Sequence, residues 1–213
     1  MFEVISESFS QESIDLLLRD LREDRLVCKG KSEVKGDKRY WAVDTDNYEL
    51  VSKFSALATE LFSKKTRKHP ENVIVMINKI NSDESFDGSG GGWHVDSLQN
   101  QYKLFTYLTN CEKTSLGPLT LLTTNNQLLD RIIVATNYIL GNKFRFSEKV
   151  VGYISKLGFK ERPVLLSKNK PFWINTSFIH RGAKITEGER ILMTAYIYDG
   201  IIPPSIQGRI DGK

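Results

Sequence analysis

The sequence has 213 residues, of which 40% are hydrophobic and 26% are charged, and this composition excludes disordered, collagen-like and coiled-coil chains. Lys and Arg number 30 and Asp and Glu 26, so the net charge of +4 is well short of the basic charge typical of dedicated nucleic-acid-binding proteins. A chain of this length buries enough surface to fold as one domain, residues 1–213, without a disulfide or a structural metal.

The two cysteines, Cys28 and Cys111, are too few for a disulfide framework and lack the spacing of a zinc motif. The first residues are acidic where a secretory signal is basic, and no run approaches the roughly 18 apolar residues of a membrane span. We therefore expect a cytoplasmic protein with free thiols and no membrane partner. These features leave the oligomeric state open.

The hydrophobic period changes near Pro70. Before it, apolar residues recur at helical spacing behind a candidate cap at Ser10, and again between Leu50 and Leu61, which predicts a mainly helical support over residues 1–70. After it, short runs of β-branched and aromatic residues predict strands. The predicted strands cover residues 73–80, 102–109, 118–122, 163–166, 172–174 and 191–198.

A mostly helical insert interrupts these strands at about residues 125–160. Apolar residues share a face between Leu128 and Thr136, and Ser147 is a candidate cap for a second helix that ends at Gly158. Without the insert, residues 71–200 contain only strands and turns. This organisation predicts a mainly β fold, a jelly roll or barrel with flanking helices, and a doubly wound α/β sheet is the alternative.

Two of the three histidines lie in segments that indicate a metal site. His94 and Asp96 are two residues apart, so in an extended segment both side chains point to one side. His180, in a later strand, is a candidate third ligand. Two histidines and a carboxylate on one face of an octahedral ion leave three positions open, as in non-haem Fe(II) oxygenases. A chance His-x-Asp followed by an unrelated histidine is the alternative interpretation.

Arg190 opens the last predicted strand, shortly after His180. A 2-oxo acid that chelates a metal carries a second carboxylate, and a guanidinium can bind that carboxylate through two parallel hydrogen bonds. On the strand at 102–109, Lys103 and Tyr107 point to one side and are candidates to contact the same cosubstrate. The alternatives are a surface arginine, a lysine that reaches solvent and a core tyrosine.

Neighbouring residues are weaker candidates. Trp93 is a candidate wall of a substrate channel, and packing explains it equally well. Asn78, Asn81 and Asn175 are candidates for contacts to the cosubstrate or to a ligand, with strand-end capping or turn contacts as alternatives. Arg181 is expected to point away from His180, toward substrate or the surface.

Two further runs have simple interpretations. The glycine run at 88–92 lacks the Lys-Ser/Thr of a nucleotide loop, so we expect a mobile loop beside the metal entrance. The basic run at 64–68 can bind phosphates, but at the end of a helix it more simply complements the helix dipole.

The sequence resembles the phytanoyl-CoA dioxygenase-like branch of Fe(II)- and 2-oxoglutarate-dependent oxygenases in four segments that occur in the same order, GGGWHVDS, YKLFTYLTN, SLGPLTLL and NTSFIHRGAKITEGERILMTAYIY. The resemblance covers about residues 80–199. It implies a double-stranded β-helix (jelly-roll, cupin-like) core, iron held by His94, Asp96 and His180, and Arg190 paired with the distal carboxylate of 2-oxoglutarate. Related halogenases have a small residue in place of the carboxylate, so Asp96 favours hydroxylation.

We therefore expect an Fe(II)- and 2-oxoglutarate-dependent dioxygenase that hydroxylates a small organic substrate and releases succinate and CO2. Replacing His94 or Asp96 with alanine is expected to abolish turnover and leave the fold intact. One alternative is a non-enzymatic jelly-roll module that binds a carbohydrate or an anionic ligand. A nucleic-acid-modifying oxygenase that uses the basic run at 64–68 is disfavoured by the near-balanced charge.

Overall fold

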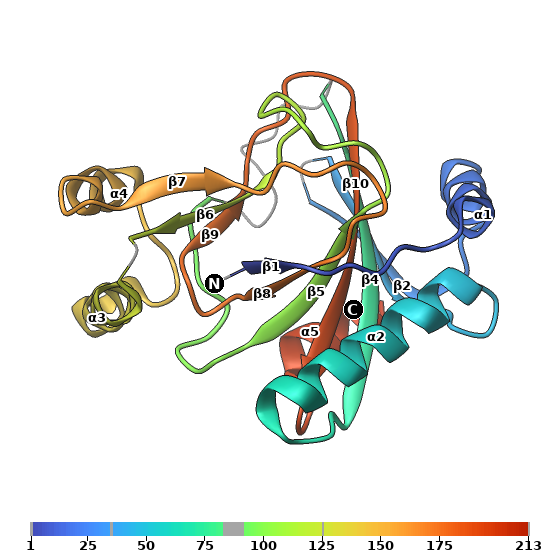
Figure 1. The fold of residues 1–213 in the computed structure, drawn as a ribbon, viewed down its shortest axis with the longest axis horizontal. Helices are drawn as coiled ribbons and strands as arrows, with labels where there is room; N and C mark the ends of the chain where they lie inside the picture. Colours follow the sequence, from blue (N-terminus) through green and yellow to red (C-terminus); the bar gives the residue numbers. More distant parts are fainter. Residues whose placement is uncertain (1, 35, 83–91, 125, 213) are drawn as a thin grey trace.

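The computed structural model describes residues 2–34, 36–82, 92–124 and 126–212 (Figure 1). None of the described helices is long and apolar enough to cross a membrane. The elements in chain order are β1 (Phe2–Val4), α1 (Gln11–Arg22), β2 (Cys28–Val34), β3 (Asp37–Val43), α2 (Glu49–Thr66), β4 (Asn72–Asn81), β5 (Tyr102–Tyr107), β6 (Leu119–Thr123), α3 (Gln127–Asn137), the π-helical turn η1 (Tyr138–Asn142), α4 (Glu148–Ser155), β7 (Lys160–Pro163), β8 (Phe172–Asn175), β9 (His180–Gly182), β10 (Glu189–Tyr198) and α5 (Pro204–Ile210).

The strands form two sheets. The main sheet has the order β1-β8-β5-β10-β4-β3-β2, and the small sheet has the order β7-β6-β9. Neighbouring strands of both sheets pair antiparallel. Residues of the two sheets, including Phe105, Phe172 and Leu121, meet in one apolar cluster. The predicted mainly β jelly roll is thus confirmed. The doubly wound α/β alternative is excluded, because that fold has a mostly parallel sheet whereas the strands here pair antiparallel.

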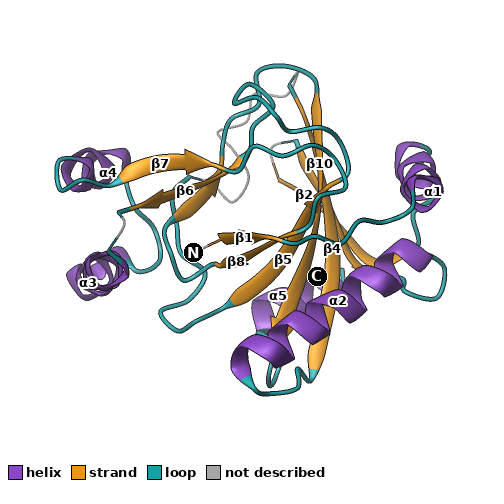
Figure 2. Cartoon of the chain, viewed as in Figure 1, coloured by secondary structure: helices purple, strands orange, loops and turns teal. Residues whose placement is uncertain are grey.

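Alternation along the central strands separates two faces of the main sheet. On β10, Ile191 and Met193 point to the outer face, where they pack against α1 and α2, whereas Leu192 points inward toward the small sheet. Figure 2 shows α1 and α2 on one side of the main sheet and α3 and α4 beside the small sheet. Lys103 and Phe105 alternate with Leu104 in the same way, so Lys103 lies on the inner face.

The prediction of a mainly helical segment over residues 1–70 is wrong for its middle part. Both predicted helices exist, and the Ser10 hydroxyl caps α1 by accepting from the amide of Ser13 at 3.2 Å. Between them, however, β2 and β3 form a hairpin that extends the main sheet. β2 is an edge strand of mostly exposed, charged residues, so it lacks the apolar alternation by which a strand is recognised.

The insert predicted at about 125–160 contains α3, η1 and α4. Ser147 caps α4, because its hydroxyl accepts from the amide of Val150 at 3.3 Å. The strand predicted at 163–166 is displaced toward the N-terminus, where β7 ends at Pro163. Val164 keeps one bond to β6, from its amide to the Leu119 carbonyl at 2.8 Å. The displacement arises because the β7 residues are polar and largely exposed and carry no hydrophobic signal.

The C-terminal helix α5 packs so closely on β2 that Gly30 has no space for a side chain. A Cβ atom at Gly30 would lie 2.1 Å from the carbonyl oxygen of Arg209 and 2.8 Å from that of Ile210. We expect Gly30→Ala to lower the free energy of unfolding by about 1–3 kcal/mol, because backbone of α5 must move. Urea denaturation measures this change.

Gly152→Ala, in α4, is the matched control, because a Cβ atom there meets nothing within 4 Å. Alanine favours the helix, so this variant is expected to be stabilised by up to about 1 kcal/mol. Equal stability of the two variants would contradict the close packing of α5 on β2.

Candidate metal centre

Backbone pairing holds His94 and His180 side by side. The amide of His94 donates to the carbonyl of His180 at 2.9 Å, and the amide of His180 donates to the carbonyl of His94 at 2.8 Å. Directly opposed residues of antiparallel segments project their side chains to the same face, and the two ring centroids are 4.3 Å apart. The segment around His94 therefore extends the small sheet beyond β9.

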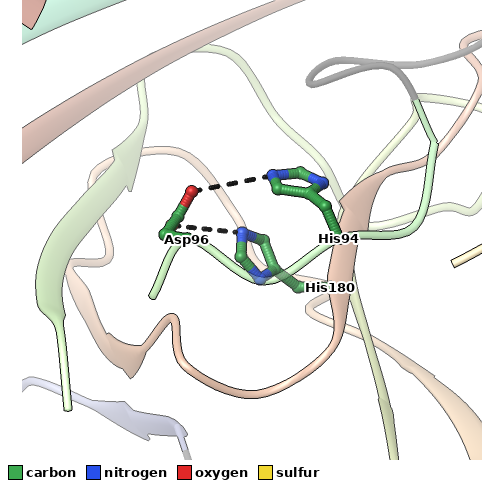
Figure 3. Close-up of side chains that lie close together, drawn as sticks. All are labelled: His94, Asp96 and His180. Carbon is green, nitrogen blue, oxygen red and sulfur yellow. Dashed lines mark ion pairs between the residues drawn. The ribbon is translucent and has the colours of Figure 1, made fainter. Parts of the chain in front are cut away.

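Asp96 completes the cluster. Its amide donates to the carbonyl of Thr176 at 3.0 Å, which fixes the chain two residues beyond His94. The Asp96 carboxylate oxygens lie 3.8 Å from Nε2 of His94 and 3.5 Å from Nε2 of His180 (Figure 3). One ligand atom from each of the three residues lies within 4.8 Å of the others. The structure thus brings together the three side chains that the sequence predicts as ligands.

Both imidazoles are oriented by backbone carbonyls. Nδ1 of His94 lies 2.9 Å from the carbonyl of Gly92, and Nδ1 of His180 lies 2.9 Å from the carbonyl of Phe178. A carbonyl only accepts, so each Nδ1 carries the proton and donates it. Each Nε2 is left with a lone pair directed at Asp96, which is the tautomer that binds a metal.

The electrostatics favour the ligand forms of all three groups. Burial and the nearby His180 lower the pKa of His94 to about 3, and burial likewise lowers the pKa of His180. Burial alone would raise the pKa of Asp96, but the Lys103 ammonium and the two imidazoles outweigh it and hold this pKa below its usual value. Near neutral pH the site therefore offers two neutral imidazoles and one carboxylate.

The insert contributes directly to the site. The amide of Val95 donates to the carbonyl of Phe144 at 3.0 Å, and the amide of Phe146 donates to that of Trp93 at 3.0 Å. The segment around Arg145 is thus the outer neighbour of the segment around His94. The sequence prediction did not include this pairing. The only signal is the alternation Phe-Arg-Phe, which is too short to identify a strand between two helices.

Lys103 contacts one of the candidate metal ligands, Asp96. Its Nζ donates to Oδ2 of Asp96 at 2.8 Å and lies 3.9 Å from the centroid of the Tyr196 ring. The Lys103 side chain is 7% exposed and that of Asp96 is 20% exposed, so the ammonium is buried and the carboxylate is partly buried. Proximity to Asp96 outweighs burial and raises the pKa of Lys103, which keeps the ammonium charged.

Tyr107 uses its hydroxyl to join the two sheets. The hydroxyl donates to the carbonyl of Val164 at 3.2 Å and accepts from the amide of Leu119 at 2.9 Å. Burial raises the pKa of Tyr107 far above its usual value, so the hydroxyl keeps its proton. These contacts explain the burial of the tyrosine.

Arg190 is a buried cation without a counter-charge among the described residues. It is 1% exposed, and its Nη1 donates to the carbonyl of Gly117. Its Nε and Nη2, which form one edge of the guanidinium, have no hydrogen-bond partner in the described part of the chain. An unpaired buried charge is costly, so this edge is suited to an anion. Arg190 shares the inward side of β10 with Leu192.

The three asparagines have local roles in the structure. Nδ2 of Asn78 donates to Oδ1 of Asp37 at 3.2 Å, and Asn81 is the last residue of β4. Oδ1 of Asn175 accepts from the amide of Ser177 at 3.1 Å, which forms the turn before β9. The turn interpretation accounts for the contact of Asn175, whereas Asn78 lies inside β4, so its contact with Asp37 is not a strand-end cap.

Trp93 and Arg181 pack against each other. The guanidinium carbon of Arg181 lies 4.1 Å from the centroid of the buried Trp93 ring, and its Nη2 lies 3.2 Å from a carboxylate oxygen of Glu161. Trp93 belongs to the apolar cluster beneath the insert. The packing interpretation of Trp93 accounts for these contacts.

The structure tests the interpretations of the glycine run at 88–92 and the basic run at 64–68 only in part. Residues 83–91, which include most of the glycine run, lie outside the described residues. Gly92, with φ +87°, is described, and its carbonyl orients His94. Lys64 and Lys65 lie in the last turn of α2, where cations complement the helix dipole.

The fold is similar to those of solved 2-oxoglutarate-dependent oxygenases. HygX from Streptomyces hygroscopicus, solved with nickel, 2-oxoglutarate and hygromycin B, is 15% identical with a TM-score of 0.57, over 94% of this chain and 84% of HygX. A Pseudomonas putida prolyl-4-hydroxylase is 10% identical with a TM-score of 0.58, over 94% and 93% of the two chains. The alpha-ketoglutarate-dependent epimerase SnoN from nogalamycin biosynthesis is 9% identical with a TM-score of 0.58, over 93% and 77%.

At these identities the similarity establishes the fold. No protein-family model matches the sequence, and no curated protein matches it. The solved neighbours include a hydroxylase and an epimerase, so the fold accommodates more than one outcome of this chemistry.

The Asp96–Lys103 ion pair changes the expected effect of one substitution. Asp96→Ala removes the counter-charge of a buried ammonium, so we expect it to destabilise the fold by about 3–5 kcal/mol, in contrast to the expectation from sequence. The double variant Asp96→Ala/Lys103→Met removes both charges and is expected to recover most of this loss. Urea denaturation of the metal-free protein measures both. Additive effects of the two substitutions would contradict a coupled pair.

Proposed function

We propose that the protein is an Fe(II)- and 2-oxoglutarate-dependent oxygenase that hydroxylates a small organic substrate and releases succinate and CO2. The observation that carries the proposal is the unpaired buried edge of Arg190 on the inner side of the main sheet, together with the metal-ligand cluster on the small sheet that packs against it. A group of metal-ligand side chains alone is compatible with many kinds of metal-binding protein. The same group together with a buried guanidinium fits a ligand that has a chelating end and a distal anionic end.

Each part of the site has a defined role in this proposal. Nε2 of His94, Nε2 of His180 and the carboxylate of Asp96 would hold the iron. When bound, iron together with 2-oxoglutarate and dioxygen supplies the oxidant that inserts oxygen into a C–H bond, while 2-oxoglutarate is cleaved to succinate and CO2. Nε and Nη2 of Arg190 bind the distal carboxylate of 2-oxoglutarate. The apolar inner faces of the two sheets exclude water around these contacts.

The roles of Lys103 and Tyr107 differ from those predicted from the sequence. Lys103 lies opposite Tyr196 in the register of β5 and β10. Tyr196 is six residues from Arg190 on β10, so the backbone positions of Lys103 and Arg190 are about 20 Å apart along the strand direction. We assign Lys103 to the metal side and Arg190 alone to the distal carboxylate. Tyr107 lies near enough to Arg190 for the guanidinium to lower the pKa of its hydroxyl, although burial dominates. We assign its ring to the wall of the cosubstrate pocket.

The order of the four motif segments supports placement in the phytanoyl-CoA dioxygenase-like branch. Two of these segments carry the metal-ligand cluster, and the other two supply β5 and β6 on the facing sheets. Strands from the first 43 residues and from the last 25 residues join one sheet, which supports a single oxygenase domain over residues 1–213.

An anaerobic titration tests the cofactor assignment without knowledge of the substrate. Fe(II) and then 2-oxoglutarate are added to the metal-free protein, and a weak visible charge-transfer band is expected. His94→Ala is expected to abolish the band, because one of three ligands is lost. His69→Ala is the matched control, since His69 is the remaining histidine and its Nδ1 lies 2.9 Å from the carbonyl of Pro70. It is expected to keep the band.

A folded wild-type protein without the band would contradict the proposal and favour a jelly-roll module that binds a carbohydrate or an anion. A band that persists in His94→Ala would contradict the ligand assignment while leaving the cofactor class intact.

Arg190→Lys tests the cosubstrate clamp. Lysine keeps the charge but lacks the planar pair of donors, so we expect the affinity for 2-oxoglutarate to fall about ten- to a hundredfold, as for loss of a charge-assisted hydrogen bond. Fe(II) binding is expected to be unchanged. Titration of 2-oxoglutarate into the Fe(II) protein measures the change, with the exposed Arg19→Lys as the matched control. Equal affinities in Arg190→Lys and wild type would place the clamp elsewhere.

A further inference from the structure

Lys103 links the metal-ligand cluster to the main sheet. His94 and His180 belong to segments of the small-sheet side, and Asp96 lies on the irregular chain that follows His94. Lys103 comes from β5, in the main sheet. Among the described residues, its bond to Oδ2 of Asp96 at 2.8 Å is the polar side-chain contact between the cluster and that sheet.

The position of Lys103 is fixed from several sides. The Tyr196 ring lies beneath its ammonium at 3.9 Å, and β5 pairs Lys103 directly with Tyr196 on one side and with Ile174 on the other. The side chain is 7% exposed. A buried ammonium held in this way cannot follow Asp96 if the carboxylate rotates, so the ion pair defines one orientation of the carboxylate.

The two carboxylate oxygens have different surroundings. Lys103 binds Oδ2, which also lies 3.5 Å from Nε2 of His180, whereas Oδ1 lies 3.8 Å from Nε2 of His94. A carboxylate with one oxygen held by an ammonium presents the other oxygen to a metal. A carboxylate without that contact can bind through both oxygens and so occupy one more position on the ion. That position is among the three needed by 2-oxoglutarate and dioxygen.

We infer that Lys103 is a positioning residue that holds Asp96 as a one-oxygen metal ligand and keeps the remaining positions open. This inference rests on the proposed function, because it requires a metal at the cluster. It assigns the lysine a role different from the cosubstrate contact suggested by the sequence. Second-layer contacts to ligating carboxylates of this kind orient the ligand.

Removal of the Lys103 charge distinguishes a lysine that positions Asp96 from a lysine that acts on the metal only through its charge. A lysine that acted only as a neighbouring positive charge would repel a divalent cation, and its removal would tighten metal binding. A positioning lysine has the opposite effect, because its removal releases the ligand. Lys103→Met keeps the length of the side chain and removes the charge and the donor.

The experiment is a calorimetric titration of the metal-free protein with Mn(II) at pH 8. Lys103→Met is expected to bind Mn(II) about ten- to a hundredfold more weakly than wild type, as for loss of an orienting contact to a metal ligand. Lys53→Met is the matched control, since Lys53 is exposed on α2 and pairs with Glu49. It is expected to match wild type. Circular dichroism verifies that each variant is folded.

Equal or tighter binding of Mn(II) by folded Lys103→Met would overturn the inference. Failure of the wild-type protein itself to bind Mn(II) or Fe(II) would instead overturn the proposed function.

A second measurement does not depend on the variant. In a crystal structure of the wild-type Mn(II) protein, one-oxygen ligation by Asp96 with Nζ of Lys103 on the other oxygen is expected. Ligation by both oxygens with Lys103 turned away would overturn the inference.

Discussion

The candidate metal centre depends on one backbone pairing, the mutual hydrogen bonds of His94 and His180. Because directly opposed residues share a face, this register places both imidazoles on the inner side, and a shift of one residue would turn one of them away. The same pairing makes the chain around His94 part of the small sheet, so Asp96 follows at the distance of an extended segment. Carbonyls within these two segments also fix the tautomers of the rings. Ligand identity, orientation and protonation thus derive from sheet geometry.

The apolar space between the sheets carries two buried cations of contrasting status. Lys103 has its counter-charge in Asp96, whereas Arg190 has only a carbonyl contact in the described part of the chain. A buried charge is tolerated where it is paired, so the Lys103 ammonium has the counter-charge that burial requires, whereas the Arg190 guanidinium is suited to an anion. In the sequence, Arg190 is the main candidate to bind the cosubstrate and Lys103 a secondary one, and the fold places the two residues in different surroundings.

The sequence predicts much of this arrangement because the relevant signals are local. Runs of β-branched and aromatic residues at 102–109 and 191–198 predict the central strands, and the His-x-Asp spacing predicts two ligands on one side of an extended segment. The hairpin of β2 and β3 was not predicted, because an edge strand of charged residues has no apolar period. The bond from Lys103 to Asp96 and the pairing of Trp93 and Val95 with the insert were not predicted either, since each depends on which segments meet in three dimensions.

The strand order of the main sheet also constrains when the centre can form. β4 at residues 72–81 pairs with β10 at residues 189–198, and β1 pairs with β8, so the central hydrogen bonds join segments that are distant in the chain. Contacts of large sequence separation form late, because the intervening loop must first be closed. During synthesis, His94 therefore emerges long before His180 and the strand that carries Arg190. A partial chain therefore lacks the third residue of the candidate centre, which is complete only when the last strands have formed.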